Sequence, residues 1–203
     1  MIRIAAIVLA AGRATRFSGG VAGATKLTAE HAGKPLVRHA AEAALGAGLS
    51  PVVVVTGHAR AQTLAALEGL DFVEAHNAAF AQGIALSLRT GLDALPDDVA
   101  GVVVLLGDMP RVSAALTKAL VAAFRAAPRT DAVAPAQGGR RGNPVLLARS
   151  LFSAARALDG DEGARRLLRR ADVRVTEVAV DDAGAFEDID TPEQLARLGP
   201  DRP

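Results

Sequence analysis

The sequence predicts an α/β fold in which a mixed, mainly parallel sheet is flanked by helices. Two wholly apolar runs, residues 4–9 and 102–106, lack the polar alternation of a half-exposed strand, so each is expected to be covered on both faces. Strand-like and helix-like segments alternate over the first two thirds of the chain, which is typical of βαβ units. Because no linker or repeat interrupts this order, residues 1–203 are expected to form a single domain.

The composition narrows the class of partner. The formal net charge is +1 over 203 residues, so no global field favours a polyanion. Six Phe and no Tyr or Trp argue against a base-stacking platform for nucleic acid. There is no cysteine and no signal-peptide pattern, and no apolar run approaches the roughly 20 residues of a transmembrane helix. We therefore expect a cytoplasmic protein that binds neither nucleic acid nor membrane.

The first half of the chain contains three expected strands and three expected helices. The strands are residues 4–9, 51–55 and 72–74. The first helix begins at Pro35 and is ended by Gly46 and Gly48. The second helix covers residues 59–67, and the third runs from Ile84 through Leu88 and Leu92 to Leu95.

The second half contains the strongest strand pattern of the chain, residues 101–106. A helix from Ser113, a strand over 131–135, a polar turn over 137–142 and a strand over 143–147 are expected next. Ala164, Leu167, Leu168 and Ala171 have helical spacing after the turn at 160–163, and a strand follows over 174–180. The last helix has Thr191 as its N-cap, with Pro192 and Gln194 completing a capping box.

After Leu9, the first strand leaves the sheet through three residues with little or no side chain, namely Ala10, Ala11 and Gly12. Backbone N–H groups in such a turn form an anion-binding concavity, to which Arg16 and Lys26 add positive charge. We expect phosphate there, and the alternative is a surface loop with two solvated cations. The turn has neither the G-x-G-x-x-G fingerprint of a dinucleotide fold nor the Gly-Lys-Ser/Thr of a P-loop.

Carboxylates mark a candidate metal site. Asp108 directly follows the strand over 101–106, where hard oxygen ligands can meet Mg²⁺ at the carboxyl edge of a sheet; alternatively it only begins a turn. Asp188 and Asp190 alternate on an extended segment, so only one of them is expected to join Asp108. We favour Asp190 as the second Mg²⁺ ligand, although either residue alternatively only favours the positive end of the last helix.

Two further segments are candidate contacts for ligands. Gly83 to Ser87 opens a helix, which leaves N–H groups and the Ser87 hydroxyl available. Arg141, Gly142 and Asn143 can present a cation and an amide to an acceptor, or form an ordinary hairpin-like turn. The arginines between 165 and 170 are interpreted as a solvated helix face, and none of the four histidines has metal-ligand spacing.

Seven segments in this order resemble the MobA-like NTP transferase family, most closely its molybdenum cofactor cytidylyltransferase branch. They are Leu9-Ala-Ala-Gly-x-x-x-Arg16, the downstream Lys26, Gly33-Lys-Pro-Leu36, Leu106-Gly-Asp-Met-Pro110, Arg141-Gly-Asn-Pro144, Gly160-Asp-Glu-Gly-Ala-Arg165 and Asp188-Ile-Asp-Thr-Pro192. The likeness covers nearly the whole chain. One departure is the segment 18–25, which is longer than the Met-Gly-x-x-Lys of the branch.

The resemblance implies a Rossmann-like nucleotidyltransferase fold and Mg²⁺-dependent transfer of a nucleoside monophosphate from CTP or GTP to a phosphorylated acceptor such as molybdopterin cofactor. Leu9 to Gly12, Gly83 and Ser87 would bind the nucleoside, and Arg16 and Lys26 the triphosphate. Asp108 and Asp190 would hold Mg²⁺, and Arg141 to Asn143 would face the acceptor. A molybdoenzyme or its chaperone is the implied protein partner.

Two other readings remain open. The same motifs resemble an NAD(P)H-dependent oxidoreductase of the nicotine blue oxidoreductase type, since one fold can carry different chemistries. The other is a nucleotide-binding accessory protein without catalysis, which would bind an NTP and release no pyrophosphate.

Overall fold

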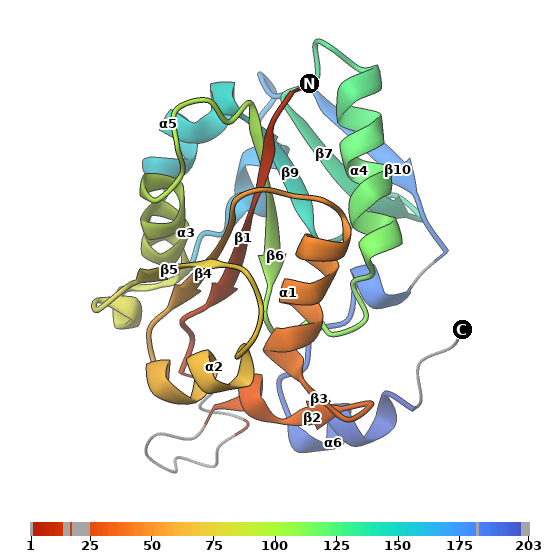
Figure 1. The fold of residues 1–203 in the computed structure, drawn as a ribbon. Coiled ribbons are helices and arrows are strands. Elements are labelled where there is room, and N and C mark those ends of the chain that lie inside the picture. Colours follow the sequence, from red (N-terminus) through yellow and green to blue (C-terminus); the bar gives the residue numbers. More distant parts are fainter. Residues whose placement is uncertain (1, 14–16, 18–24, 182, 200–203) are drawn as a thin grey trace.

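A computed structural model of the chain describes residues 2–13, 17, 25–181 and 183–199. Its centre is an eight-stranded sheet of order β10-β7-β9-β6-β1-β4-β5, with β8 paired to β7 (Figure 1). The strands are β1 Ile4–Ala10, β4 Val52–Thr56, β5 Val73–His76, β6 Gly101–Leu106, β7 Ala132–Gln137, β8 Arg140–Arg141, β9 Val145–Ala148 and β10 Val175–Ala179. A separate small hairpin pairs β2, Glu30–His31, with β3, Lys34–Pro35.

The sheet is mixed and mainly parallel, as the sequence predicts. Strand β1 pairs in parallel with β4 on one side and with β6 on the other, whereas β9 is antiparallel to both β6 and β7. The chain first builds outward from β1 through β4 and β5, and then returns to the other side of β1 with β6. This reversal makes a topological switch point, and in open α/β sheets ligands bind beyond the carboxyl ends of the strands at such a point.

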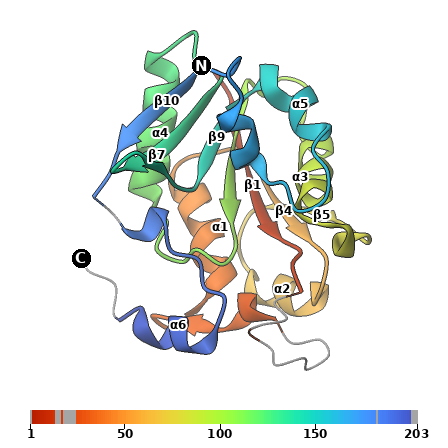
Figure 2. The ribbon, with the colours of Figure 1, turned by 180° about the vertical axis from the view of Figure 1, so that it is seen from behind.

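Helices cover both faces of the sheet (Figures 1 and 2). The α1 helix, Leu36–Gly46, and the α4 helix, Ala114–Ala126, pack on one face; α3, Ile84–Asp93, and α5, Phe152–Arg156, pack on the other. Helices α2, Arg60–Ala66, and α6, Pro192–Arg197, lie near the carboxyl end of β1 in Figure 1. Short 3₁₀ helices are η1 Lys26–Thr28, η2 Phe80–Gln82, η3 Arg149–Leu151, η4 Ala164–Arg169 and η5 Ala183–Ala185.

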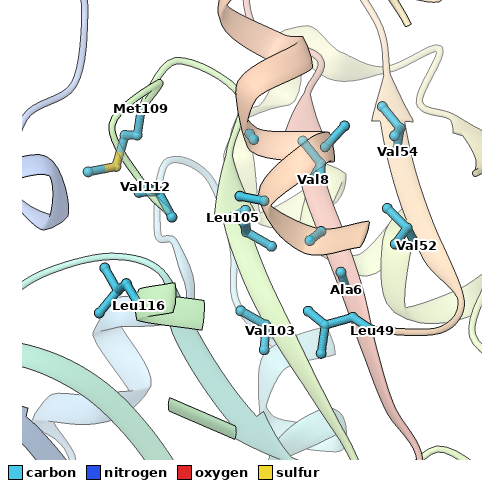
Figure 3. Packing of buried hydrophobic residues seen from close by; sticks show 14 of the residues in the cluster. Ala6, Val8, Leu49, Val52, Val54, Val103, Leu105, Met109, Val112 and Leu116 are labelled. Carbon is cyan, nitrogen blue, oxygen red and sulfur yellow. The ribbon is translucent and has the colours of Figure 1, made fainter. Parts of the chain in front are cut away.

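Small aliphatic side chains fill the core on each face. All seven residues of β1 are buried, and its alternate side chains enter two separate hydrophobic clusters. Figure 3 shows one cluster, in which Val8 lies among Val54 and Leu105 from the neighbouring strands. Each fully buried Val or Leu contributes roughly 1.5–3 kcal/mol relative to exposure, so β1 and β6 form a rigid base for the residues that follow them.

The structure differs from the predicted elements at several short segments, and the hairpin of β2 and β3 is one element that the sequence does not predict. Residues 164–169 form a 3₁₀ helix rather than a regular helix, the polar turn over 137–142 contains the short strand β8, and α5 has no counterpart among the predicted elements. The strands β1, β4, β6, β7, β9 and β10 and the helices α1 to α4 are confirmed with small changes in their ends. The capping box of Thr191 and Gln194 at α6 is also present.

No helix in the described ranges combines the length and the apolar character that crossing a bilayer requires.

Candidate nucleotide-binding site

The turn after β1 is held at the edge of the sheet by main-chain hydrogen bonds. Gly107 N–H donates to the Leu9 carbonyl at 3.0 Å, and His58 N–H donates to the Ala11 carbonyl at 3.1 Å. A Cβ built on Gly12 would have no neighbour within 4 Å, so the backbone there faces open space and can be approached closely by a ligand. Arg16, predicted to bind the triphosphate, lies outside the described residues.

Lys26 brings two of the predicted carboxylates together. Its ammonium lies 2.7 Å from a carboxylate oxygen of Asp108 and 2.6 Å from one of Asp190. The Lys26 side chain is only 12% exposed. Burial disfavours its charged form, but the charges and hydrogen bonds of Asp108 and Asp190 outweigh this and raise the pKa of Lys26 above its usual 10.5. The ammonium is therefore a firmly held cation between two hard oxygens.

Each member of this cluster comes from a different element. Lys26 begins η1, whose N-cap Thr25 accepts a hydrogen bond from Leu27 N–H. Asp108 follows β6, and the Asp108 carbonyl accepts a hydrogen bond from Ile189 N–H at 3.0 Å. Ile189 is 2% exposed and packs against Leu36 and Leu198, which fixes the segment between Asp188 and Asp190 against the edge of the sheet.

Asp190, rather than Asp188, is the residue that joins Asp108 at Lys26. Asp188 has the opposite orientation that an extended segment predicts. It lines a cavity that Lys26 and Asp108 also line, whereas Asp190 is not part of that lining. The α6 cap follows directly: the Gln194 side chain accepts hydrogen bonds from Asp190 N–H at 2.7 Å and Thr191 N–H at 2.9 Å. The cap therefore also positions the Asp190 backbone.

A cavity of about 410 Å³ opens beside this cluster, and we call it the Lys26 cavity. Lys26, Asp108, Gly83 and Ser87 line it, together with Leu9, Ala11 and Gly12 from the end of β1. Ala10, which the resemblance places with the nucleoside-binding residues, does not line the cavity. Its side chain points into the core and is 1% exposed. Ser87 is buried and accepts a hydrogen bond from the Asn77 amide at 3.0 Å, which fixes the hydroxyl oxygen in the wall.

The lining of the Lys26 cavity contains more negative than positive charge. Asp108, Asp161 and Asp188 line it, against Lys26 and Arg13, within the ranges that the structure describes. The Arg13 guanidinium lies over the Phe80 ring, 5.5 Å from its centroid. A triphosphate bound here would meet carboxylates as well as cations, and an additional cation would offset this negative charge.

The donor set fits a divalent cation shared with a phosphate ligand. Two carboxylate oxygens already hold one cationic group, the Lys26 ammonium. No group of three or more His, Asp or Glu side chains that could hold a metal occurs among the described residues. Mg²⁺ is commonly bound by one or two carboxylates, with water and substrate phosphates completing the shell, and Asp108 and Asp190 match that arrangement.

A second cavity of about 410 Å³, the Arg165 cavity, adjoins the first. The two share five lining residues, so they meet at a common junction: Leu9, Ile84, Leu106, Asp161 and Asp188. Asn143, predicted to face the acceptor, lines the Arg165 cavity. Gly142 packs against the chain instead, since a Cβ there would lie 2.3 Å from the Ala185 carbonyl oxygen.

Arg141 is placed differently from the acceptor contact that the sequence predicts. Its guanidinium donates to Glu177 at 2.7 Å and to the Leu168 carbonyl, and it is not part of the cavity lining. Arg165, Arg166 and Arg169 line the cavity in its place, although the sequence interpretation treated them as a solvated helix face. The motif from Gly160 to Arg165 was the available signal, because it belongs to the resemblance and had no role assigned.

Comparisons with known proteins identify the family and the fold of the chain. The family model of the MobA-like NTP transferase domain matches residues 6–175. Nicotine blue oxidoreductase from Paenarthrobacter nicotinovorans is 32% identical over 203 residues, which covers 96% of each chain. Rv0371c from Mycobacterium tuberculosis H37Rv has a TM-score of 0.83 over 97% of each chain, at 26% identity. It has also been solved in complex with manganese, with a TM-score of 0.76.

A structure described as a nucleotidyl transferase from Methanothermobacter thermautotroptrophicus is similar to the same extent. Its TM-score is 0.80 at 26% identity, over 97% of this chain and 95% of that one.

Proposed function

Because the chain belongs to the MobA-like NTP transferase family, we propose that it transfers a nucleoside monophosphate from an NTP to a phosphorylated small molecule and releases pyrophosphate. The observation that supports this most directly is the cluster of Lys26, Asp108 and Asp190, of which Lys26 and Asp108 line the Lys26 cavity. It lies beyond the carboxyl ends of β1 and β6, where the topology favours a nucleotide.

The proposed chemistry needs no general base from the protein. A phosphomonoester has a second pKa near 6, so its oxygen is already a nucleophile at neutral pH. That oxygen attacks the α-phosphorus in line, a new P–O–P bond forms, and the bond between the α- and β-phosphates breaks to release pyrophosphate. The protein supplies positioning and charge neutralisation.

The residues of the site would share this work. The open backbone at Gly12 and the wall at Ser87 would bind the nucleoside, and Lys26 with Arg16 would bind the phosphates. Asp108 and Asp190 would hold a divalent cation, whose contribution when bound is to neutralise charge that develops on the triphosphate. A relative with 26% identity has been solved with manganese, which supports a divalent cation, and we propose Mg²⁺.

Within this class we propose CTP as the first nucleotide to test, GTP as the second, and a molybdopterin-type compound as the acceptor. These choices rest on the resemblance to the cytidylyltransferase branch through segments such as Leu106-Gly-Asp-Met-Pro110. The molybdoenzyme or chaperone partner is proposed on the same basis.

The test is pyrophosphate release from each of the four NTPs with Mg²⁺ and candidate phosphomonoesters. Removing the carboxylate in Asp108→Asn should reduce release by roughly 100-fold or more, as the loss of a charge-stabilising group in an active site does. The matched control is Asp172→Asn, because Asp172 is exposed and pairs with Arg170. Full turnover by Asp108→Asn would contradict the assignment.

A second candidate is an oxidoreductase, favoured by the name of the relative that is 32% identical over 96% of the chain. It predicts consumption of NAD(P)H with a quinone-like acceptor and no release of pyrophosphate from any NTP. The sequence lacks the G-x-G-x-x-G turn of dinucleotide-binding folds after its first strand. Parallel assays for both activities separate the two functions.

A further inference from the structure

Two of the arginines that line the Arg165 cavity, Arg165 and Arg169, have no salt bridge within the described part of the chain. Their neighbours are paired, since Arg166 bonds to Glu162 and Arg170 to Asp172. The positive charge of Arg140 acts on Arg165.

The surroundings of Arg165 disfavour its charged form. Burial, together with the charges of Arg140 and Arg169, lowers the pKa of Arg165, and Asp188 partly opposes this. An anion bound between like charges at close range would offset their repulsion. Guanidinium groups are suited to this, because their planar donors match phosphate oxygens two at a time.

The chain holds Arg165 in position from both sides. The Arg165 guanidinium donates to the Arg141 carbonyl at 2.7 Å, and the Arg141 side chain is itself anchored on Glu177. Leu167 and Leu168 of the same 3₁₀ helix are buried. The predicted acceptor residue Arg141 therefore contributes through its main chain, by orienting Arg165.

Arg165 and Arg169 lie beside the place where transfer would occur. Asp188 lines both cavities and is close enough to Arg165 for its charge to act on the guanidinium. The Asn143 side chain lines the same cavity and adds a neutral donor. An anion held by Arg165 would consequently face the junction with the Lys26 cavity.

We propose that Arg165 and Arg169, with Asn143, bind the phosphate of a phosphomonoester acceptor and direct one of its oxygens toward the junction. This inference rests on the proposed function, because the acceptor must be phosphorylated for the transfer described above. It names the residues that select the acceptor class, and it gives the Gly160 to Arg165 segment a role.

The test is the dissociation constant of phenyl phosphate, measured by calorimetry with the full chain. It is measured first without nucleotide, and then with Mg²⁺ and an α,β-methylene NTP, which occupies the Lys26 cavity and cannot be cleaved. Arg165→Gln and Arg169→Gln should each weaken binding by roughly tenfold or more, since each removes charge-assisted hydrogen bonds. Arg170→Gln is the matched control, because Arg170 pairs with Asp172 at the exposed end of the same segment.

Benzoate and inorganic phosphate serve as comparison probes. Phosphate and phenyl phosphate should compete for one site, and benzoate should bind at least tenfold more weakly, because it offers fewer oxygens and less charge. Equal binding of phenyl phosphate to the wild type and both arginine variants overturns the proposal, as does no binding to the wild type or equal binding of benzoate. Intact phosphate binding without pyrophosphate release in any assay would contradict the proposed function alone.

Discussion

At the scale of single residues, Lys26 determines whether the two carboxylates beside it can coexist. Asp108 and Asp190 are 20% and 35% exposed in their side chains and share one ammonium. Lys26→Met would leave two partly buried carboxylates facing each other. We expect the free energy of unfolding at about pH 8 to fall by roughly 1–3 kcal/mol, measured by urea titration.

The pH dependence gives this prediction its sign. The pKa of Lys26 is raised in the folded protein above its usual 10.5, so its contribution is complete below that pH and is lost as pH rises through the higher folded value. The difference between wild type and Lys26→Met should therefore shrink at about pH 11.5. Lys34→Met is the control, because Lys34 is 49% exposed and pairs with Glu42 at the surface, where ion pairs contribute less than about 1 kcal/mol. Equal costs for the two variants at about pH 8 would refute the role given to Lys26.

The sequence predicts the positions of some site residues and not of others. Asp108 was identified because a carboxylate after an apolar strand must lie at the carboxyl edge of the sheet, and the structure places it there. Arg165 was not predicted as a ligand contact, since charged residues on one helix face have the same spacing whether that face meets solvent or lines a cavity formed by distant segments. Only the fold distinguishes a solvated face from a cavity wall. The fold also pairs the Arg141 guanidinium with Glu177.

At the scale of elements, the start of α3 depends on a close approach between two glycines. Gly83 has φ +112 and ψ 171, a region that is essentially restricted to glycine. A Cβ there would lie 2.1 Å from the Gly160 carbonyl oxygen, which also accepts a hydrogen bond from Ala85 N–H at 3.1 Å. The contact joins α3, which lines the Lys26 cavity, to the loop that precedes η4.

Replacing Gly83 should therefore disturb both cavities together. We expect Gly83→Ala to cost about 3 kcal/mol or more in unfolding free energy, from combined backbone strain and steric clash. Gly69→Ala is the control, because Gly69 also has positive φ, +81, but a Cβ there has no neighbour within 4 Å; strain alone should cost about 1 kcal/mol. Urea titrations that give equal values for the two variants would show that the contact with Gly160 contributes nothing.

The element that the sequence described least well is the segment over 164–169. Its apolar residues have helical spacing, but the structure forms only a 3₁₀ helix of six residues. The segment is anchored at one end by the Gly160 contact with α3 and buries Ala164, Leu167 and Leu168 on the sheet. Tertiary packing, rather than local periodicity, sets its geometry, and local patterns cannot report such long-range constraints.

At the scale of the whole molecule, the site exists only because the sheet reverses its direction of growth at β1. Lys26 and Asp190 are 164 residues apart in sequence yet form one ion pair. The alternation of strands and helices predicted the parallel sheet, but strand order follows from contacts between distant segments. The ordered set of family motifs supplied what local patterns lacked, by implying that Asp108 and Asp190 act together.

The charge balance of the assembled site predicts how ligands stabilise the whole chain. Carboxylates outnumber cations around the Lys26 cavity in the described ranges, so an NTP without metal should bind weakly and Mg²⁺ without an NTP lacks most of its ligands. The NTP and Mg²⁺ together, at a concentration about 100 times the dissociation constant of their complex with the protein, should stabilise the fold by roughly 2.7 kcal/mol. This should raise the melting temperature by roughly 5 to 10 °C. Thermal unfolding with each ligand alone and with both measures this synergy.

Asp108→Asn provides the decisive comparison in that experiment. Removing one carboxylate weakens the hold on the cation and should abolish most of the joint stabilisation, while Asp172→Asn, at an exposed ion pair, should keep it. A full shift with an NTP in the presence of a metal chelator would mean that the arginines and Lys26 neutralise the triphosphate on their own. The two aspartates would then act only to position Lys26, and the proposed metal site would be wrong.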